Sequence, residues 1–262
     1  IYLSWLGLYL LPQRGLEALT PCLNCFPLFL VVTYEQFAAN CDAVRQRIKS
    51  ACEQCGRNPS EVRILPVTKT NPVEAALYAY RYGMRSVSEN KVQEGQEKKP
   101  LAPADLRWEF IGHLQSNKVK PALKIFDIIQ TVDTVDLILR MGRIAEEIQV
   151  KPEIYFQVNS GHDPAKFGCE IEEAPQLLEA ALNQSALRVV GLMAVPPIEG
   201  GMDSAKRTFD NLRLCRDQLQ DKFKVSLPEL SIGMSGDMEA AVIAGSTCVR
   251  LGSSLYGPRT QK

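Results

Sequence analysis

The chain has no excess charge of either sign and very little histidine. Its 262 residues carry 30 basic and 30 acidic side chains, with only two histidines. A balanced chain offers no electrostatic signature for nucleic acid or for an anionic membrane, so we expect neither as a partner. Two distant histidines without a His-Glu-x-x-His spacing argue against a metal site, and we predict no metal. Any anion site must therefore be local, built from a few groups in one pocket.

Long apolar runs are also missing. The apolar stretches at 1–11 and 21–32 are each broken or bordered by proline, and neither reaches the ~20 residues that span a bilayer. Neither has the basic start or small-residue cleavage site of a secretory signal, and the chain does not begin with methionine. We therefore treat residues 1–32 as a poorly specified extension and residues 33–262 as the folded domain, without a firm membrane partner.

Cysteine, by contrast, is plentiful, with eight in the chain. Two Cys-x-x-Cys pairs, Cys22/Cys25 and Cys52/Cys55, raise zinc as an alternative, but the gap between them exceeds the usual ribbon spacing. Cys52 and Cys55 also fall in an expected helix, where this spacing marks one face. The remaining cysteines are scattered through apolar segments, as small buried hydrophobes often are. This pattern indicates a reducing compartment, and we expect a cytoplasmic protein.

Strand and helix patterns alternate along the rest of the chain. A helix is expected over 34–55, strands at 62–68, 85–88, 107–111, 126–132, 153–158, 188–193, 229–232 and 248–251, and helices over 72–82, 134–149, 170–182, 204–221 and 237–244. Eight βα units in this length imply a parallel sheet closed into a single (β/α)8 TIM barrel, with an extra N-terminal helix. An open doubly wound sheet is the alternative, weakened because no Gly-x-Gly-x-x-Gly turn follows the first strand. Pro66 weakens the first strand, because proline cannot donate a ladder hydrogen bond.

Polar residues gather where the predicted strands end. Lys69 follows the first strand, and Asn90 follows the second. Because the carboxyl ends of barrel strands form one mouth, where barrel proteins keep their active sites, we expect these side chains to converge. Burial lowers the pKa of a lysine, and a neutral amine can attack a carbonyl to form a Schiff base. The alternative is a lysine whose head simply reaches solvent at the strand end.

Two loops containing glycine and serine follow the seventh and eighth strands, at 233–237 and 252–254. Glycine lets backbone N–H groups approach an anion closely, and serine hydroxyls donate further hydrogen bonds. Barrels often hold a phosphate at this place, so the loops predict a phosphate site. Turns of this composition also serve simply as helix caps, which is the alternative.

Arg250 lies within the eighth strand at a position expected to face the barrel interior. A guanidinium stays charged and requires an acceptor, which is either a ligand atom or a structural carboxylate such as Glu89 or Asp237. A Schiff-base lysine, a phosphate cradle and a buried arginine together suggest pyridoxal 5′-phosphate (PLP) as the cofactor. Lys69 would bond its aldehyde carbon, and Arg250 would face its pyridine nitrogen.

The two histidines are weaker candidates. His113 follows Gly112, a glycine that suggests close approach of the backbone to something, and a catalytic role for His113 is a minor alternative. His162 lies in a polar loop, where we expect a solvated side chain.

Several motifs identify a family. They are VTKT at 67–70, SEN at 88–90, FIGHLQSNK at 110–118, VN at 158–159, KFG at 166–168, GLM at 191–193, LSIGMSGD at 230–237 and VRLGS at 249–253. Over about residues 34–259 the chain resembles the YggS/PROSC family of pyridoxal phosphate homeostasis proteins, which is similar to the N-terminal barrel domain of alanine racemases.

The resemblance implies roles for individual residues. Lys69 would be the Schiff-base lysine, Arg250 would meet the ring nitrogen, Asn90 and Met234 would line the pocket, and the phosphate would be bound by Ser235, Gly252 and Ser253. Ser253 stands where threonine is common in the family, which keeps the hydroxyl. Ser88 stands where glycine is usual, and we expect a slight change in the turn after the second strand.

Two functions remain open. The first is a monomeric, non-catalytic carrier that buffers PLP and delivers it to PLP-dependent apo-enzymes. The second is a PLP-dependent enzyme resembling an amino-acid racemase. Racemases of this type draw a second base from an additional β domain, and this chain stops at Lys262, so we expect the carrier. An arginine at the ring nitrogen disfavours protonation there and makes a poorer electron sink, although related racemases use arginine too. A Schiff-base aldolase is disfavoured, because no carboxylate accompanies Lys69 in its turn.

Overall fold

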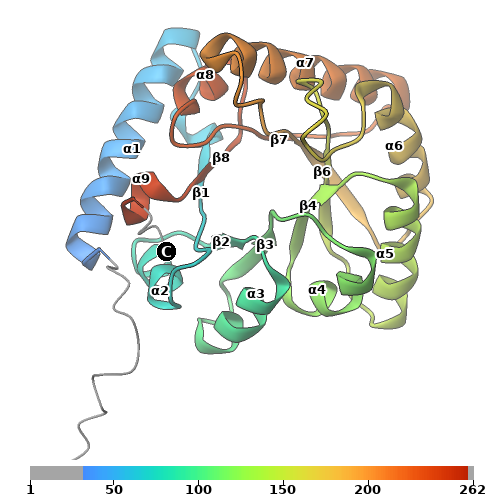
Figure 1. The fold of residues 1–262 in the computed structure, drawn as a ribbon, viewed down its shortest axis with the longest axis horizontal. Helices are drawn as coiled ribbons and strands as arrows, with labels where there is room; N and C mark the ends of the chain where they lie inside the picture. Colours follow the sequence, from blue (N-terminus) through green and yellow to red (C-terminus); the bar gives the residue numbers. More distant parts are fainter. Residues whose placement is uncertain (1–31, 259–262) are drawn as a thin grey trace, which may run out of the picture.

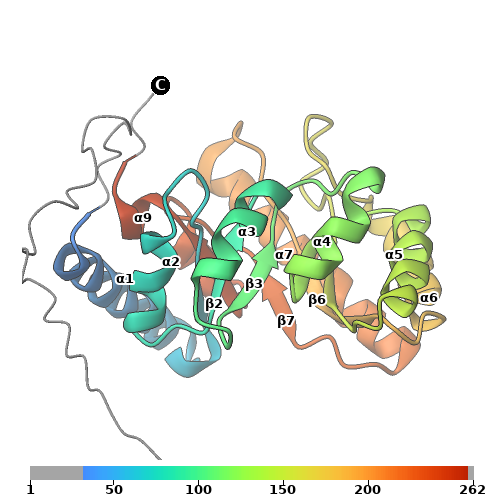
Figure 2. The same cartoon turned by 90° about the horizontal axis from the view of Figure 1, so that it is seen from below.

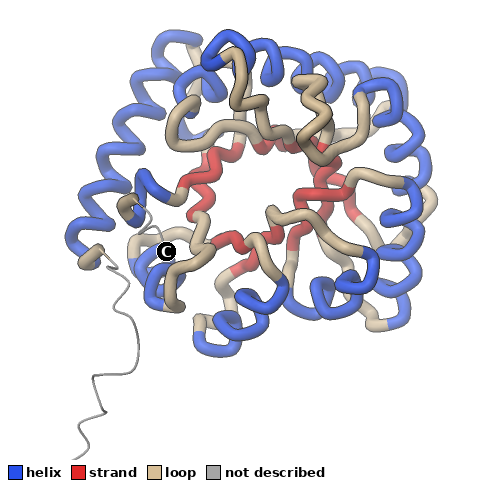
Figure 3. The backbone as a smooth tube through the Cα atoms, in the orientation of Figure 1, coloured by secondary structure: helices blue, strands red, loops and turns tan. Residues whose placement is uncertain are grey.

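Eight parallel strands form a ring that is surrounded by helices (Figures 1 and 3). This computed structural model describes residues 32–258. The strands are β1 Arg63–Pro66, β2 Ser86–Glu89, β3 Arg107–Phe110, β4 Ile128–Val132, β5 Glu153–Gln157, β6 Arg188–Met193, β7 Glu229–Ser231 and β8 Cys248–Leu251. The predicted TIM barrel is confirmed, and the open doubly wound alternative is wrong.

The α-helices are α1 Tyr34–Cys55, α2 Glu74–Arg81, α3 Val92–Lys98, α4 Val119–Ile125, α5 Val135–Glu147, α6 Ala174–Leu182, α7 Gly201–Phe223, α8 Met238–Ile243 and α9 Ser253–Tyr256. Short 3₁₀ helices occupy Pro59–Glu61, Lys99–Leu101, Ser116–Lys118 and Ile171–Glu173. In the part of the chain that is described, no helix is both long and apolar enough to cross a membrane.

The barrel closes at a seam between β1 and β2, next to Pro66. Around the ring β1 pairs with β8, and the pairs then run in order down to β2. Pro66 is the last residue of β1 and has no amide hydrogen to donate. The seam therefore depends on the residues around it: the amide of Thr68 donates to the carbonyl of Ser88 at 3.0 Å, and the Ser88 hydroxyl donates to the carbonyl of Pro66 at 3.0 Å. Ser88 thus lies inside β2, and its hydroxyl joins the two strands.

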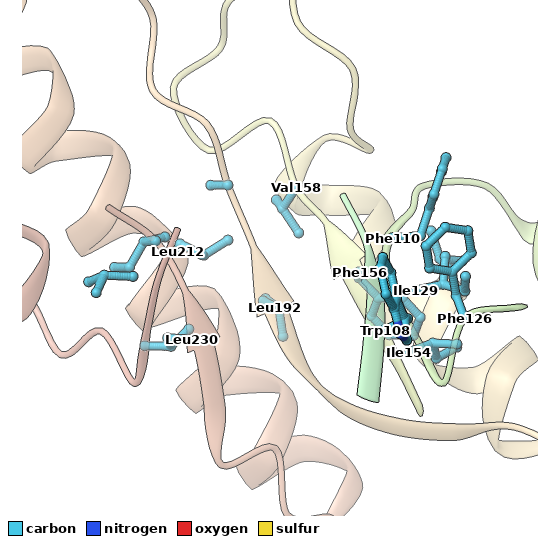
Figure 4. Close-up of a cluster of buried hydrophobic side chains, with 14 of the residues drawn as sticks. Trp108, Phe110, Phe126, Ile129, Ile154, Phe156, Val158, Leu192, Leu212 and Leu230 are labelled. Carbon is cyan, nitrogen blue, oxygen red and sulfur yellow. The ribbon is translucent and has the colours of Figure 1, made fainter. Parts of the chain in front are cut away.

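The apolar core lies mainly between the strands and the outer helices. Trp108 and Phe110 of β3 point into this layer, and Phe110 packs against Phe126 with ring centroids 5.1 Å apart (Figure 4). A smaller cluster of Ile128, Tyr155, Val190 and Met193 is separate from this layer. Along β3, Glu109 alternates with these outward residues and so faces the interior. This alternation leaves the interior of the barrel partly polar, which matters for the site.

Helix α1 is the predicted N-terminal helix and has the predicted bounds. Thr33 begins it with a capping box, and Gly56 ends it in the left-handed conformation, at φ 68°. It packs beside α8 and α9 on one side of the barrel (Figure 1), and α9 is also seen beside it in Figure 2. Cys52 is buried on its inner face, while the Cys55 thiol donates to the carbonyl of Ala51 at 3.3 Å.

The zinc alternative finds no support within the described residues. Cys22 and Cys25 lie outside them, as does the predicted extension up to residue 31. Among residues 32–258, no group of three or more histidine, cysteine or acidic side chains is arranged to hold a metal ion.

Candidate functional site

The predicted site residues lie at the carboxyl ends of four consecutive strands of the ring: β7, β8, β1 and β2. Pro66 of β1 is in register with Leu251 of β8, and the amide of Val67 donates to the Leu251 carbonyl at 2.8 Å. On the other side of β8, the amide of Arg250 donates to the carbonyl of Gly233 at 2.9 Å. Segments that are almost 200 residues apart in the chain are therefore neighbours at one mouth.

Lys69 lies in the turn that follows the β1–β2 seam and is half-buried. The strand ends earlier than predicted, at Pro66, and Val67 adds a single bridge to Ser88. The turn is tightly hydrogen-bonded: the carbonyl of Lys69 accepts from the Thr70 hydroxyl at 2.6 Å and from the Asn71 amide side chain at 3.3 Å. The backbone that carries the lysine is thus held in one place.

Asn90 immediately follows β2 and carries a buried acceptor. Its Oδ1 has no hydrogen-bond partner among the described residues. A buried polar atom left this way costs about 1–3 kcal/mol unless a ligand or water satisfies it. The backbone of Asn90 is closely approached by Gly112, where an added Cβ would lie 2.0 Å from the Asn90 carbonyl oxygen. The close approach expected at Gly112 is therefore confirmed, and it explains why no larger residue fits there.

Ser235 and Ser253 come together from the two predicted phosphate loops. The Ser253 hydroxyl donates to the Ser235 hydroxyl at 3.2 Å, and the amide of Ser254 approaches the same oxygen at 3.4 Å. Ser235 is half-buried and Ser253 is exposed, so both can reach a molecule in the mouth. Two hydroxyls and an amide at one point are suitable donors for a phosphate.

Met234 and Gly252 flank this pair of serines. Met234 is 38% exposed, and its amide donates to Asp237 Oδ1 at 2.6 Å. A Cβ added to Gly252 would lie 3.6 Å from the Val67 carbonyl oxygen, which is an ordinary contact. Neighbouring protein atoms therefore do not require glycine at 252, and its small size leaves space at the mouth.

Arg250 is buried inside the barrel and binds uncharged acceptors. Its Nη1 donates to the Ser231 carbonyl at 2.5 Å and to the Ser231 hydroxyl at 2.8 Å, and its Nη2 donates to the Ala194 carbonyl at 2.9 Å. Burial lowers the pKa of Arg250, partly offset by nearby acidic groups. No salt bridge joins it to a carboxylate among residues 32–258, so the alternative of a structural pair with a carboxylate such as Glu89 or Asp237 is wrong.

A chain of polar side chains inside the barrel supports Arg250, and sequence reasoning missed it. The Ser231 hydroxyl donates to Gln130 Oε1 at 2.6 Å, and Gln130 Nε2 donates to Glu109 at 2.6 Å. Glu109 in turn accepts from Arg63 at 2.7 Å. The available signal was a glutamine, a serine and a glutamate inside short strand patterns, where polar residues need partners.

The histidines follow β3 and β5, outside the four strands that carry the predicted site residues. His113 is exposed and stacks on Phe167, with ring centroids 3.9 Å apart, and its Nδ1 lies 3.9 Å from Asp133. His162 is exposed as predicted and pairs with Glu170 at 3.0 Å.

A cavity of about 980 Å³ lies at the opposite end of the barrel, where the strands begin. Its lining includes the first residues of several strands, such as Arg63, Arg107, Glu153 and Arg188. None of the seven predicted site residues lines it. The charged side chains there mostly pair with one another, as Arg107 and Arg188 do with Glu153.

Comparisons with known proteins agree with this geometry. Residues 39–260 match the family described as "Alanine racemase, N-terminal domain". The pyridoxal phosphate homeostasis protein of Aquifex aeolicus is 37% identical over 82% of this chain and 95% of its own length. That of Escherichia coli K12 is 34% identical over 85% and 96%.

Solved structures show the same barrel. PipY of Synechococcus elongatus, determined with PLP bound, has a TM-score of 0.75, with 31% identity over 84% of this chain and 100% of that one. An alanine racemase of Clostridium difficile has a TM-score of 0.69 at 17% identity, over 87% of this chain and 58% of that one, which shows the fold alone. The chain therefore belongs to the pyridoxal phosphate homeostasis protein family, whose barrel is the alanine racemase N-terminal domain.

Proposed function

We propose that this protein binds PLP at the four-strand mouth through Lys69, and that it buffers the cofactor and delivers it to PLP-dependent apo-enzymes without catalysis. We further propose that residues 33–262 form the binding domain and act as a monomer in the cytoplasm. One observation carries the proposal. The turn that holds Lys69 follows β1, which pairs with β8, and the segment after β8 carries Ser253, whose hydroxyl is hydrogen-bonded to that of Ser235.

The residues at the mouth fit PLP. The phosphate needs donors, and the Ser253 hydroxyl and the Ser254 amide both lie within 3.4 Å of the Ser235 hydroxyl, so that three donors are grouped at one point. The unpaired Oδ1 of Asn90 provides a buried polar atom that a ligand can satisfy. The apolar side chain of Met234 is exposed beside these donors, where a flat aromatic ring can cover it.

Each residue has a separate task in this proposal. Bound PLP supplies an aldehyde carbon that a lysine amine can capture reversibly. Lys69 provides that amine, and Ser235 with Ser253 anchors the phosphate. Arg250 presents a positive charge toward the ring nitrogen and so disfavours a proton there, while Ser231 and the Ala194 carbonyl hold its guanidinium in place.

The non-catalytic part of the proposal draws on the relatives. Proteins that this chain matches over 95% of their length are named for homeostasis of PLP rather than for a reaction. A ring nitrogen kept unprotonated by Arg250 also weakens the electron sink that amino-acid chemistry requires. The racemase-like alternative is kept, because the barrel of an alanine racemase has the same fold.

Absorbance and peptide mapping test the binding. Incubation with PLP should give a yellow protein, and borohydride should fix the cofactor on the peptide that contains Lys69. Lys69→Ala should abolish the covalent adduct, whereas Lys120→Ala, which changes an exposed lysine paired with Glu147, should not. A colourless protein in excess PLP, or a label on another lysine, would contradict the proposal.

A second measurement separates carrier from enzyme. The PLP-loaded protein should leave the optical rotation of L-alanine and other amino acids unchanged. The same loaded protein should restore activity to an apo-enzyme that requires PLP. Racemisation that disappears with Lys69→Ala would establish the enzyme alternative instead.

A further inference from the structure

A buried ionic cluster lies behind the turn that holds Lys69, on the helix side of the barrel wall. Lys98, the last residue of α3, donates to Glu89 Oε1 at 2.7 Å and lies 3.3 Å from Glu94 Oε2. The side chains of Lys98 and Glu89 are 9% and 0% exposed. We refer to Glu89, Glu94 and Lys98 as the Lys98 cluster. Glu89 is in register with Phe110, so it faces the outer core layer rather than the barrel interior.

The Lys98 cluster forms hydrogen bonds with Thr68, the residue before Lys69. Lys98 Nζ donates to the carbonyl of Thr68 at 3.0 Å. The Thr68 hydroxyl donates to Glu89 Oε1 at 2.6 Å. Both the backbone and the side chain of Thr68 are therefore fixed from the helix side, at the residue where the barrel closes.

The Lys98 cluster also forms a hydrogen bond with Thr70, the residue after Lys69. Glu94 Oε2 accepts the amide of Thr70 at 2.8 Å. Thr70 has a φ of 64°, in the left-handed region that β-branched residues rarely adopt. Such a conformation is strained and persists only where surrounding contacts enforce it. The hydrogen bond to Glu94 is one such contact, so the shape of the turn depends on the cluster.

We propose that Lys98, with Glu89 and Glu94, is a positioning device that sets the place and direction of Lys69 for attachment to PLP. The proposal rests on the function proposed above and adds residues to it. One lysine connects the two carboxylates that hold Thr68 and Thr70, so a single side chain controls both ends of the three-residue segment. None of the three residues needs to contact the cofactor.

Stability alone is a poor explanation for this cluster. Replacing a buried ion pair with apolar side chains of similar volume is often neutral or stabilising. Glu89 Oε2, moreover, has no hydrogen-bond partner in the described part of the chain. A buried carboxyl group with one oxygen left without a hydrogen bond, next to a strained turn, is typical of a functional site.

The test compares Lys98→Met with Lys99→Met in the full chain. Lys99 is the adjacent lysine, and its ammonium also binds one carbonyl, that of Ile125 at 2.5 Å, and one carboxylate, that of Asp127 at 3.3 Å. Lys99 is therefore a matched control, because it makes the same kinds of contact at the end of α3 but with the segment before β4 instead of the turn of Lys69. A second pair is Glu94→Leu and Glu94→Gln, because the glutamine oxygen can still accept the Thr70 amide.

Two readouts are needed. The first is the rate at which PLP absorbance develops, together with the pH midpoint of the adduct spectrum. The second, without PLP, is the acetylation rate of Lys69 relative to exposed lysines, measured by peptide mapping. Lys98→Met and Glu94→Leu should slow adduct formation by about tenfold or more, since a misplacement of about 1 Å can cost 10²-fold. They should also change the relative acetylation of Lys69, whereas Lys99→Met and Glu94→Gln should behave as the parent.

The outcomes are distinguishable. A folded Lys98→Met with parental adduct kinetics, adduct spectrum and Lys69 acetylation overturns the positioning role and leaves the proposed function intact. If the parent itself forms no adduct, the proposed function fails, and with it the attachment that the cluster would serve. If Lys98→Met does not fold, the Glu94 pair decides: equal behaviour of Glu94→Leu and Glu94→Gln overturns the proposal.

Discussion

The hydroxyl of Ser253 donates a hydrogen bond to the hydroxyl of Ser235 at 3.2 Å, which joins the loops after β8 and β7. The turn of Lys69 follows β1, the strand next to β8 in the ring. The order of the strands therefore brings the two serine loops and this turn to the same mouth of the barrel.

Ser235→Ala and Ser253→Ala should each weaken PLP binding by about tenfold or more, since a hydrogen bond to a charged group contributes ~1.5–3 kcal/mol. The loss should be specific for the phosphate. An absorbance titration with PLP, repeated with pyridoxal, measures this difference.

The control for these variants is Ser226→Ala, an exposed serine before β7, at the other end of that strand. It should bind PLP as the parent does. Equal losses for pyridoxal and PLP in the Ser235 and Ser253 variants would show that the two serines do not contact the phosphate.

Gly112→Ala should lower stability by about 1–3 kcal/mol, because overpacking forces the neighbouring backbone to move. The added Cβ would lie 2.0 Å from the Asn90 carbonyl oxygen. Gly236→Ala is the matched control, since no atom lies within 4 Å of its added Cβ. Urea unfolding compares the two. Similar stabilities for both variants would mean that the contact with Asn90 relaxes easily.

Gln130→Leu should destabilise the protein by about 1–3 kcal/mol, the cost of leaving a buried polar group without its partner. The change removes the link between Ser231 and Glu109, on which the position of Arg250 depends. Gln218→Leu, on the exposed face of α7, should have little effect. Thermal unfolding measures both, and a parental melting temperature for Gln130→Leu would count against the interior chain.

Glu89 should make stability depend on pH. Burial raises the pKa of Glu89 from 4.5 to about 7, against the opposing influence of Lys98. The folded protein therefore holds a proton that the unfolded chain releases, and this contribution to stability is lost as the pH rises from 4.5 to about 7. Relative to the parent, Glu89→Gln should gain stability across that interval, as measured by urea unfolding at several pH values.

Glu239→Gln provides a control of opposite sign for this pH dependence. A hydrogen bond from Arg47 lowers the pKa of Glu239, so its contribution is lost only as the pH falls below the ordinary value of 4.5. The difference in unfolding free energy between Glu239→Gln and the parent should stay constant between pH 4.5 and 7. A flat difference for Glu89→Gln as well would mean that Glu89 is ionised throughout this interval.

Local patterns were sufficient for the elements and for the barrel. The 34–55 helix has the predicted bounds, because a capping residue, a helical apolar spacing and a terminal glycine all act within a few residues. Alternating strand and helix patterns likewise predicted eight strands close to those observed. The strand before Lys69 was predicted too long, because Pro66 cannot donate to the neighbouring strand.

The amino-acid sequence by itself determined the elements, their parallel order and the family motifs, and hence which residues follow which strands. Only the tertiary structure decided the hydrogen-bond partners. Arg250 binds carbonyls and Ser231 rather than a carboxylate, and Glu89 binds Lys98 on the helix side of the barrel. The physical reason is that a strand alternates its faces, while ring closure sets which strands meet. The hydrogen-bond partner of a side chain on another strand depends on strand register and on which side chains face each other, and no local stretch of sequence contains this information.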